Sequence, residues 1–364
     1  MKKIDLVVGA RPNFMKAAPL MDALQRRPDL FEPRLIHTGQ HYDYDLSRLF
    51  FEQLKMKEPD IYLGVGSGTQ AEQTARIMIE LEKVFVDSRP DMVVVFGDVN
   101  STMAAAIVAA KLWIKLAHVE AGLRSFDNTM PEEINRIVTD RLSDLLFVTE
   151  KSGLENLKKE GIPEERIFFT GNIMIDSLVK NLEIARRSPI VENLGLVRGG
   201  FVALTLHRPS NVDNPAVLKK LIEILTIIGR KIPIVFPCHP RTRNRLEEFG
   251  LKRIIDDRVI KIIEPLGYID FLRLQAESKF VLTDSGGVQE ETTFLKIPCI
   301  TLRRTTERPI TCEVGSNFLV GDDYDLLIRT ADDILDGKIK QGRIPDLWDG
   351  RTAERIVEIL ARKM

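Results

Sequence analysis

Three carboxylates of the N-terminal half stand where they could carry proton-transfer chemistry. Glu120 comes directly after a short apolar run, Asp98 follows another such run after one glycine, and Glu132 follows a proline that favours a helix start. Each of them alone is more often a helix cap or a surface charge than a catalyst. Three on one edge of a sheet, beside Arg11 in the first strand-to-helix turn, favour acid/base work on a neutral polar group.

The C-terminal half offers groups that suit a diphosphate. Ser285, Gly286 and Gly287 follow an apolar run and open a predicted helix, where backbone amides and the helix N-terminus favour an anion. Glu291 lies on the first turns of that helix, where it could accept both hydroxyls of a ribose. Arg308 follows the next apolar run and adds a forked cation to the same edge.

No metal or cofactor is predicted. His207 and His239 follow predicted strands, but neither has a cysteine or histidine partner at metal-ligand spacing. The turn that carries Arg11 is not GxGxxG. The second predicted strand ends at His37 without the acidic residue that would bind a ribose, so a dinucleotide fingerprint is absent.

The elements that must position these groups alternate along the chain. Short β-branched apolar runs, nearly continuous in hydrophobicity, alternate with amphipathic helical stretches, which is typical of doubly wound parallel sheets. The predicted strands are Ile4–Val8, Pro33–His37, Met92–Phe96, Leu116–Val119, Leu145–Val148, Ile167–Thr170, Phe201–Leu206, Ile234–Pro237, Val259–Ile263, Phe280–Thr283 and Cys299–Leu302.

A turn at Gly171-Asn172, a helical segment and a loop rich in proline and glycine separate the two series of strands. We therefore predict two Rossmann-like domains: residues 1–172, completed by a C-terminal helix 350–364, and residues 173–349. Ligands of such sheets bind outside the carboxyl ends of the strands. The prediction is a single nucleotide-sugar site in a cleft between the domains.

Composition excludes several classes of function. In 364 residues, 52 Lys and Arg face 53 Asp and Glu, so no basic excess favours nucleic acid or a membrane surface as partner. No stretch approaches the roughly 20 apolar residues of a membrane span. Three cysteines without CxxC spacing favour a reducing compartment, and we predict a cytoplasmic location.

Eight strings, in order along the chain, resemble the non-hydrolysing UDP-N-acetylglucosamine 2-epimerases, which share the two-domain fold of the glycosyltransferase-B class. They are GARPNFMK (9–16), TGQHYD (38–43), GDVNST (97–102), HVEAGLRS (118–125), MPEEINR (130–136), TLHRP (205–209), TDSGGVQEE (283–291) and TTERP (305–309). The resemblance implies reversible conversion of UDP-N-acetylglucosamine into UDP-N-acetylmannosamine, by anti elimination of UDP to a 2-acetamidoglucal and re-addition.

The resemblance also assigns roles and a homodimer. Its implied catalytic residues are Asp98, Glu120, Glu132 and His207. Its implied contacts to UDP are Arg11, Lys16, His239, Ser285, Gly286, Gly287, Glu291 and Arg308.

Two strings depart from the bacterial pattern. Many bacterial members read Gln-His-Arg-Gln near a second, activating UDP-sugar, where this chain has Gln40-His41-Tyr42-Asp43. They read His-Arg-Arg-Glu-Asn where this chain has residues 207–211, His-Arg-Pro-Ser-Asn. Allosteric activation and the downstream glycan are therefore left open. Alternatives are a hydrolysing epimerase, a 2-epimerase of UDP-2,3-diacetamido-2,3-dideoxyglucuronic acid, a glycosyltransferase of the same fold, and a silent UDP-sugar sensor.

Overall fold

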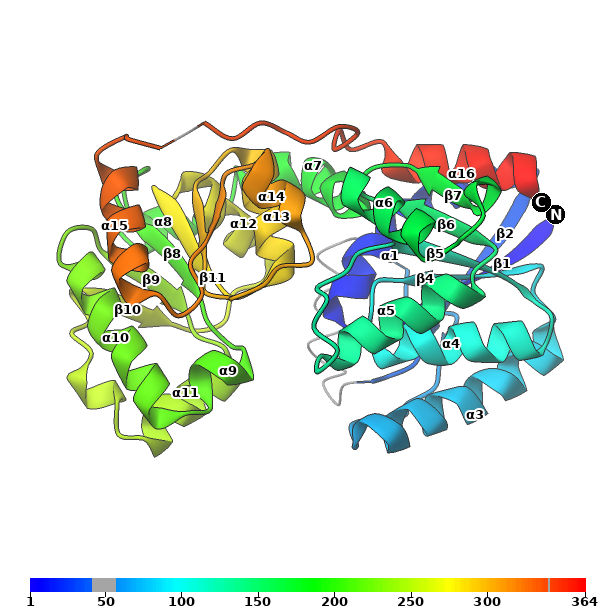
Figure 1. The fold of residues 1–364 in the computed structure, drawn as a ribbon, viewed down its shortest axis with the longest axis horizontal. Helices are drawn as coiled ribbons and strands as arrows, with labels where there is room; N and C mark the ends of the chain where they lie inside the picture. The colour runs from blue at the N-terminus through cyan, green and yellow to red at the C-terminus, as the bar shows by residue number, and fades with distance from the viewer. Residues whose placement is uncertain (41–56, 340) are drawn as a thin grey trace. The chain divides into compact units, whose positions relative to one another are not determined.

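The structure, a computed structural model, describes residues 1–40, 57–339 and 341–364, without the side chains of residues 11 and 12. His41, Tyr42 and Asp43 of the divergent loop lie outside the described residues. The chain divides into two compact units, Met1–Lys180 with Asp346–Met364 (unit 1) and Asn181–Pro345 (unit 2). Each unit is built around one sheet with helices on both faces (Figure 1).

The sheet of unit 1 is entirely parallel. Its strands are β1 (Lys2–Val8), β2 (Phe31–His37), β3 (Ile61–Tyr62), β4 (Met92–Phe96), β5 (Lys115–Ala121), β6 (Leu145–Val148) and β7 (Ile167–Phe169). Their order in space is β3-β2-β1-β4-β5-β6-β7. The chain order reverses between β1 and β4, and such a switch point is where open α/β sheets bind ligands.

The helices of unit 1 show ordinary local signals. They are α1 (Arg11–Gln25), α3 (Gln70–Ser88), α4 (Asn100–Lys111), α5 (Pro131–Leu142), α6 (Lys151–Lys159), a 3-10 turn η1 (Glu164–Arg166), most of α7 (Ile173–Ala185) and α16 (Thr352–Lys363). Thr69 and Glu72 form a capping box at the start of α3. Ile77, Leu81 and Phe85 recur every four residues and bury one face of α3.

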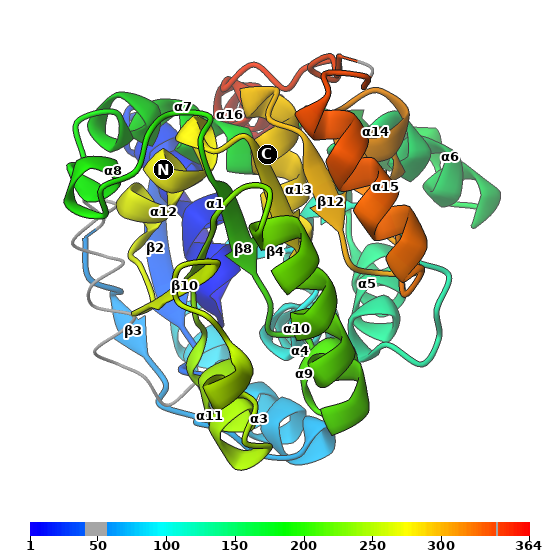
Figure 2. The same ribbon diagram turned by 90° about the vertical axis from the view of Figure 1, so that its left-hand side faces the viewer.

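Unit 2 repeats the same topology. Its strands are β8 (Val202–Thr205), β9 (Ile234–Pro237), β10 (Ile260–Ile263), β11 (Phe280–Thr283), β12 (Cys299–Thr301) and β13 (Asn317–Leu319), in the order β10-β9-β8-β11-β12-β13. Its helices are α8 (Ile190–Asn193), α9 (Pro209–Val212), α10 (Pro215–Gly229), α11 (Pro240–Glu248), η2 (Lys252–Ile254), α12 (Tyr268–Glu277), α13 (Gly286–Leu295), α14 (Pro309–Glu313) and α15 (Tyr324–Leu335). Helices α10 and α15 lie side by side (Figures 1 and 2).

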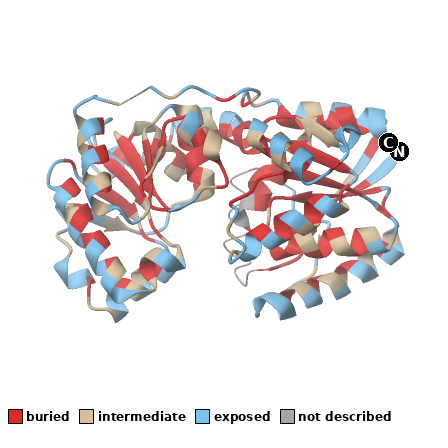
Figure 3. Cartoon of the chain, viewed as in Figure 1, coloured by how far each residue is buried: buried red, intermediate tan, exposed pale blue. Residues whose placement is uncertain are grey.

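The predicted doubly wound fold is confirmed in both units. The central strands are buried along almost their whole length, as the red strands of Figure 3 show. Sequence reasoning missed β3 and β13, which are edge strands of two and three residues with partly exposed side chains. It also ended the predicted strand Leu116–Val119 one residue before Glu120, which the structure places inside β5.

The chain returns to unit 1 through its last residues. Helix α16 packs against α1, and its first turn is capped by Asp176, whose carboxylate accepts the N–H groups of Thr352 (3.1 Å) and Ala353 (2.7 Å). The buried ring of Trp348 donates to the main-chain oxygen of Thr149 at 3.0 Å. No helix among the described residues combines the length and apolarity that crossing a membrane requires.

Candidate active site

Glu120 lies near the carboxyl end of β5, where the strand carries a bulge. The pairing of β5 with β6 slips between Val119 and Ala121, and Glu120 has φ of +79°, in the left-handed region that favours glycine. Its carboxylate forms an ion pair with Lys16 of α1, and both side chains are buried. Each charge requires the other, because a lone buried charge is costly.

Asp98 follows β4, the neighbour of β5 in the sheet. The turn before it passes through Gly97 with φ of +62°. A Cβ at Gly97 would lie 2.9 Å from Nζ of Lys16 and 3.6 Å from Oε2 of Glu120, so glycine is required there. The partly exposed carboxylate of Asp98 is paired with Arg136 of α5. The two predicted strand-end carboxylates therefore share one corner of unit 1.

Glu132 and Glu133, in the first turn of α5, have very different environments. Glu132 is exposed, whereas Glu133 is 1% exposed and accepts the main-chain N–H groups of Ser125 (2.9 Å) and Phe126 (3.0 Å). Burial would raise the pKa of Glu133, but the N–H of Ser125 and the cation of Arg136 bring it below its ordinary value. Glu133 thus anchors the preceding loop, and the catalytic role of Glu132 stays a prediction.

Helix α1 begins at Arg11, whose side chain lies outside the described part of the structure. Lys16, predicted to contact UDP, pairs with the Glu120 carboxylate. Sequence reasoning did not single out Asn13. Its Oδ1 accepts two N–H groups of the turn between β1 and α1, and its Nδ2 donates to the main-chain oxygen of Phe96 at 3.0 Å. Asn13 therefore ties this turn to the end of β4.

In unit 2, His207 follows β8 and lies beside Asp284, which follows the neighbouring strand β11. Nδ1 of His207 is 3.0 Å from Oδ1 of Asp284. Oδ2 of Asp284 accepts the main-chain N–H groups of His207 (2.9 Å) and Arg208 (2.8 Å). Burial would raise the pKa of Asp284, but these His207 and Arg208 contacts lower it below its ordinary value. The carboxylate orients the ring, which is 42% exposed and so remains accessible to a ligand.

Asp284 was missed as a partner of His207, although its place directly after a strand was a usable signal. The second predicted histidine of this edge, His239, follows β9 and caps α11, with its Nδ1 accepting the N–H of Arg241 at 3.2 Å. The ring centroids of His207 and His239 are 5.8 Å apart. The structure therefore brings these two residues together, as expected for the ends of adjacent parallel strands.

Ser285 is the N-cap residue of α13, and Gly286 and Gly287 form its first turn. The first N–H groups of a helix have no intrahelical partner, which suits an anion. A Cβ at Gly286 would lie 2.7 Å from Oε1 of Glu307. The carboxylate of Glu307, from the loop after β12, therefore lies directly against this turn.

Arg308, in the loop after β12, is held between two buried carboxylates. Its Nε is 2.5 Å from Oε1 of Glu290, and its Nη1 is 3.7 Å from Oε1 of Glu307. Burial would raise the pKa of Glu307, but Arg308 and Arg303 hold it far below its ordinary value. These ionised partners fix the guanidinium of Arg308 near the start of α13.

Glu291 is 5% exposed and lies against α12. Its Oε2 accepts the Nε2–H of Gln275 at 2.8 Å. Burial and the nearby charge of Glu291 raise the pKa of Tyr268, also on α12, well above its ordinary value. Two residues of α12 therefore fix this carboxylate, whose predicted contact with ribose stays a prediction.

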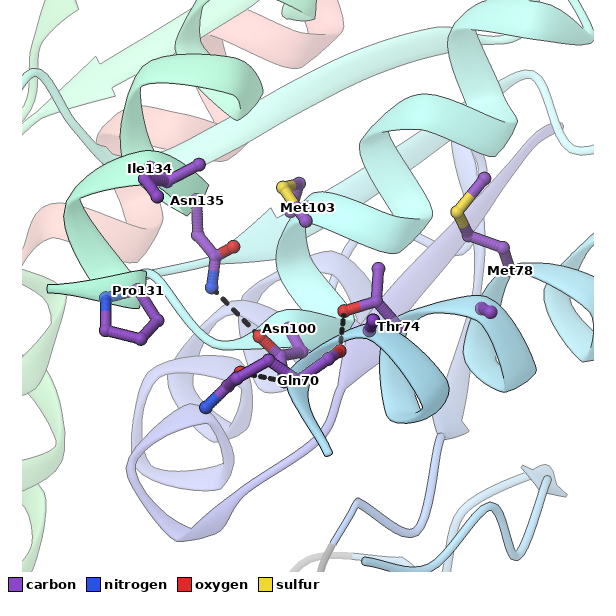
Figure 4. A pocket seen from close by; sticks show the side chains of 10 residues that line it. Gln70, Thr74, Met78, Asn100, Met103, Pro131, Ile134 and Asn135 are labelled. Carbon is purple, nitrogen blue, oxygen red and sulfur yellow. Dashed lines mark hydrogen bonds between the residues drawn. The ribbon is translucent and has the colours of Figure 1, made fainter. Parts of the chain in front are cut away.

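A separate hollow of about 360 Å³ opens between α3, α4 and α5. It is largely apolar and is lined by none of the predicted catalytic or UDP-binding residues (Figure 4). At one end, Nδ2 of Asn135 donates to Oδ1 of Asn100 (3.2 Å) and to the main-chain oxygen of Asp98 (2.8 Å). Within the described ranges, no group of three or more His, Cys, Asp and Glu is arranged to hold a metal ion.

Comparison with known proteins gives a consistent result. A family model for UDP-N-acetylglucosamine 2-epimerase matches residues 22–361. The chain is 45% identical to the UDP-N-acetylglucosamine 2-epimerase of Methanocaldococcus jannaschii, with 98% of each chain covered. It is 42% identical to the UDP-2,3-diacetamido-2,3-dideoxy-D-glucuronate 2-epimerase of Pseudomonas aeruginosa, with 99% of each covered.

Solved structures of this family also have the same fold as this chain. A crystal structure of the Methanocaldococcus jannaschii UDP-GlcNAc 2-epimerase, in complex with UDP-GlcNAc and UDP, matches with a TM-score of 0.90 and 45% identity over 99% of both chains. The similarity covers both units.

Proposed function

Because this chain belongs to the UDP-N-acetylglucosamine 2-epimerase family, we propose that it interconverts UDP-N-acetylglucosamine and UDP-N-acetylmannosamine without releasing free sugar. The observation that carries most weight is the corner of unit 1, where the buried Lys16–Glu120 pair adjoins the turn that leads to Asp98. Transfer of a sugar to an acceptor does not require three carboxylates around one sugar carbon. Removing and returning a proton at C2 requires a base and an acid, which these carboxylates can supply.

The reaction begins with elimination. The C1–O bond breaks and its electron pair leaves with UDP, while the C2 proton passes to a carboxylate and a C1=C2 double bond forms. UDP then adds back to C1 as C2 takes a proton on its other face. The C2–H bond is not next to a carbonyl, so early C1–O cleavage with positive charge on the ring is needed. Asp98, Glu120 and Glu132 are the proposed groups that move the proton and stabilise this charge.

Unit 2 is the proposed holder of the leaving group. The first turn of α13, which begins after Ser285, offers amide N–H groups to the diphosphate, and Arg308 and His239 are the proposed side-chain donors. Glu291 is the proposed ribose contact, and Arg11 of unit 1 a further phosphate contact. His207, oriented by Asp284, is the fourth proposed catalytic residue. Donors that are fixed before the reaction stabilise the developing negative charge without reorganising.

The test is the time course of products from UDP-N-acetylglucosamine alone, followed by NMR. The proposal expects UDP-N-acetylmannosamine to accumulate to a constant ratio with the substrate. Accumulation of free N-acetylmannosamine and UDP would instead identify a hydrolysing epimerase. Binding without turnover would identify a sensor.

A second substrate is supported by one observation, the 42% identity to an epimerase of UDP-2,3-diacetamido-2,3-dideoxy-D-glucuronate. Comparison of kcat/KM for the two UDP-sugars decides between them. We propose UDP-N-acetylglucosamine because the 45% identical relative carries that activity in its name.

We also propose a cytoplasmic homodimer. The family resemblance supports the dimer, as do exposed apolar side chains on α3 (Ile79 and Val86) and α5 (Ile134 and Ile137). Three cysteines without CxxC spacing agree with a reducing compartment. Light scattering on the purified chain tests the dimer, since a monomeric mass at working concentration would contradict it.

A further inference from the structure

The ring of His118 is completely buried in β5, two residues before Glu120, and no step of the proposed reaction uses it. Nδ1 is 2.6 Å from Oδ1 of Asp140, and Nε2 is 2.8 Å from the main-chain oxygen of Gly97. A carbonyl oxygen only accepts hydrogen bonds. A neutral imidazole carries one N–H, so it can satisfy only one of two accepting partners.

The other contacts of Asp140 indicate that its carboxyl group is ionised. Its Oδ2 accepts the main-chain N–H of Gly122 at 3.0 Å and lies 2.8 Å from Nη1 of Arg124. Burial would raise the pKa of Asp140, but His118 and Arg124 bring it below its ordinary value. Both oxygens therefore accept, and the ring of His118 faces an acceptor at each nitrogen.

The surrounding charges balance a buried imidazolium. Arg124 also pairs with Glu160, at the end of α6, so that His118 and Arg124 are matched by Asp140 and Glu160. The adjoining charges, Lys16 and Glu120, match each other. A buried cation that has a paired anion and two satisfied donors avoids most of the penalty of burial.

The His118–Asp140 pair forms hydrogen bonds with both turns that carry the proposed acid/base groups. The N–H of Gly97 donates to the main-chain oxygen of Val119 at 3.1 Å, and its C=O accepts from His118, so the peptide before Asp98 is held on both sides. Gly122, two residues after Glu120 and with φ of +80°, is held through its N–H by Asp140.

We propose that His118, as an imidazolium paired with Asp140, is a positioning residue that sets the spacing between Asp98 and Glu120. The proposal rests on the proposed function only for the roles of those two carboxylates. Elimination and re-addition require groups placed accurately around C2, and a displacement of about 1 Å can lower the rate about 100-fold.

Two variants separate the two contacts of the ring. In His118→Asn the amide nitrogen takes the place of Nδ1 and keeps Asp140. In His118→Gln it takes the place of Nε2 and keeps the oxygen of Gly97. We expect kcat to fall in both variants, because each breaks one of the two contacts through which the ring joins the turns of Asp98 and Glu120. The fall should be larger in His118→Asn, about 100-fold, because this variant releases the peptide before Asp98, and KM and the Kd for UDP should stay unchanged. Equal losses that follow the loss of stability in both variants would contradict positioning and leave only a structural role.

The charge of the ring is tested on the wild-type protein without reference to activity. In the NMR spectrum of the full chain labelled with 15N-histidine at neutral pH, one of the five histidines should show two protonated ring nitrogens, because its ring faces an acceptor at each nitrogen. In Asp140→Asn this signature should disappear. A spectrum in which every ring has an unprotonated nitrogen at that pH would overturn the proposal, even if the protein is an active epimerase. If the wild-type protein shows this signature but has no epimerase activity, the result counts only against the proposed function.

Discussion

Glu120 occupies a backbone conformation that a glutamate seldom adopts, and its carboxylate is buried against Lys16. A non-glycine residue in the left-handed region costs about 1–3 kcal/mol and persists only where its surroundings hold it there. Here the surroundings are the bulge of β5, the ion pair and the Asp140 contact to Gly122. Strain of this kind clusters at functional sites, which agrees with the proposed role of Glu120.

Asp98→Asn and Glu120→Gln should each lower kcat by about 100- to 10,000-fold, because each removes a proposed acid or base. The Kd for UDP, measured by calorimetry, should stay within about twofold, because the proposed diphosphate contacts lie mainly in unit 2. Wild-type turnover in either variant would remove that residue from the chemistry.

Glu132→Gln and Glu133→Gln test which carboxylate of the first turn of α5 reacts. Glu132 is exposed, so its replacement should leave the free energy of unfolding unchanged while kcat falls. Replacing Glu133 should lower that free energy as well, by about 2 kcal/mol, because glutamine keeps only one of the two acceptor oxygens and leaves buried Arg136 without this charge partner. If only Glu133→Gln loses activity, the role predicted for Glu132 is wrong.

Glu307→Gln should lower the free energy of unfolding of unit 2 by about 3 kcal/mol at pH 7, because it leaves Arg303 and Arg308 undercompensated. The folded-state pKa of Glu307 is depressed. Its stabilising contribution is therefore fully present above the ordinary carboxylate pKa of about 4.3 and declines as the pH falls below it.

The difference in free energy of unfolding between wild type and Glu307→Gln should accordingly become smaller as the pH falls from about 5 to 3. Urea titration followed by circular dichroism measures it. The matched control is Glu247→Gln, at an exposed pair with Lys252, which should change stability by less than about 1 kcal/mol at any pH. If this difference in free energy became larger as the pH falls, the depressed pKa of Glu307 would be contradicted.

Residue identity and position in the sequence sufficed to single out Asp98, Glu120 and His207 as candidates, because each stands at or just after the carboxyl end of a buried strand. They could not distinguish Glu132 from Glu133, since adjacent residues of a helix start differ only in which way they face. Asp284 and Asp140 were not recognised as partners of His207 and His118, because these contacts join segments 77 and 22 residues apart.

At the scale of elements, four strands, β4, β6, β9 and β11, have the bounds predicted from the sequence. They are central strands whose continuous apolar runs leave little choice of register. The observed end of β5 differs from the predicted one because a bulge near its carboxyl end lets the charged Glu120 continue the strand. No local pattern predicts a bulge that depends on contacts with β6 and α5.

Gly122→Ala tests the bulge. Its φ is +80°, and a Cβ would lie 2.5 Å from the main-chain oxygen of Gly153. We expect unit 1 to lose about 3 kcal/mol of stability, from left-handed strain and overpacking together, and kcat to fall. The matched control is Gly161→Ala, with φ of +74° and no atom within 4 Å of the new Cβ. It should cost only about 1 kcal/mol and leave kcat unchanged. Equal effects in the two variants would show that the close packing around the bulge is unimportant.

At the scale of the whole molecule, the chain leaves unit 1 in α7 and returns to it before α16. The sequence predicted the boundaries 172/173 and 349/350, and contacts within the structure divide the chain at Lys180 and Asp346. The difference arises because α7 is one continuous helix whose first part packs in unit 1. Hydrophobic periodicity identifies such a helix but not the unit to which each turn belongs.

Asp176→Ala should weaken the attachment of α16 to the rest of unit 1. The buried carboxylate caps α16 by accepting two N–H groups, so its loss should lower the stability of unit 1 by about 2 kcal/mol. Both tryptophans, Trp113 and Trp348, belong to unit 1, and their fluorescence reports its unfolding. Asp323→Ala removes the cap of α15 in unit 2 and should leave the tryptophan transition in place. A wild-type midpoint in Asp176→Ala would contradict the anchoring role.

The most direct test of the central claim, that a carboxylate takes the C2 proton of a UDP-sugar while UDP leaves and returns, is NMR of UDP-N-acetylglucosamine with the protein in D2O. The account predicts UDP-N-acetylmannosamine that carries deuterium at C2, with no accumulation of free sugar. Product that keeps hydrogen at C2, or a substrate that stays unchanged while bound, would contradict it.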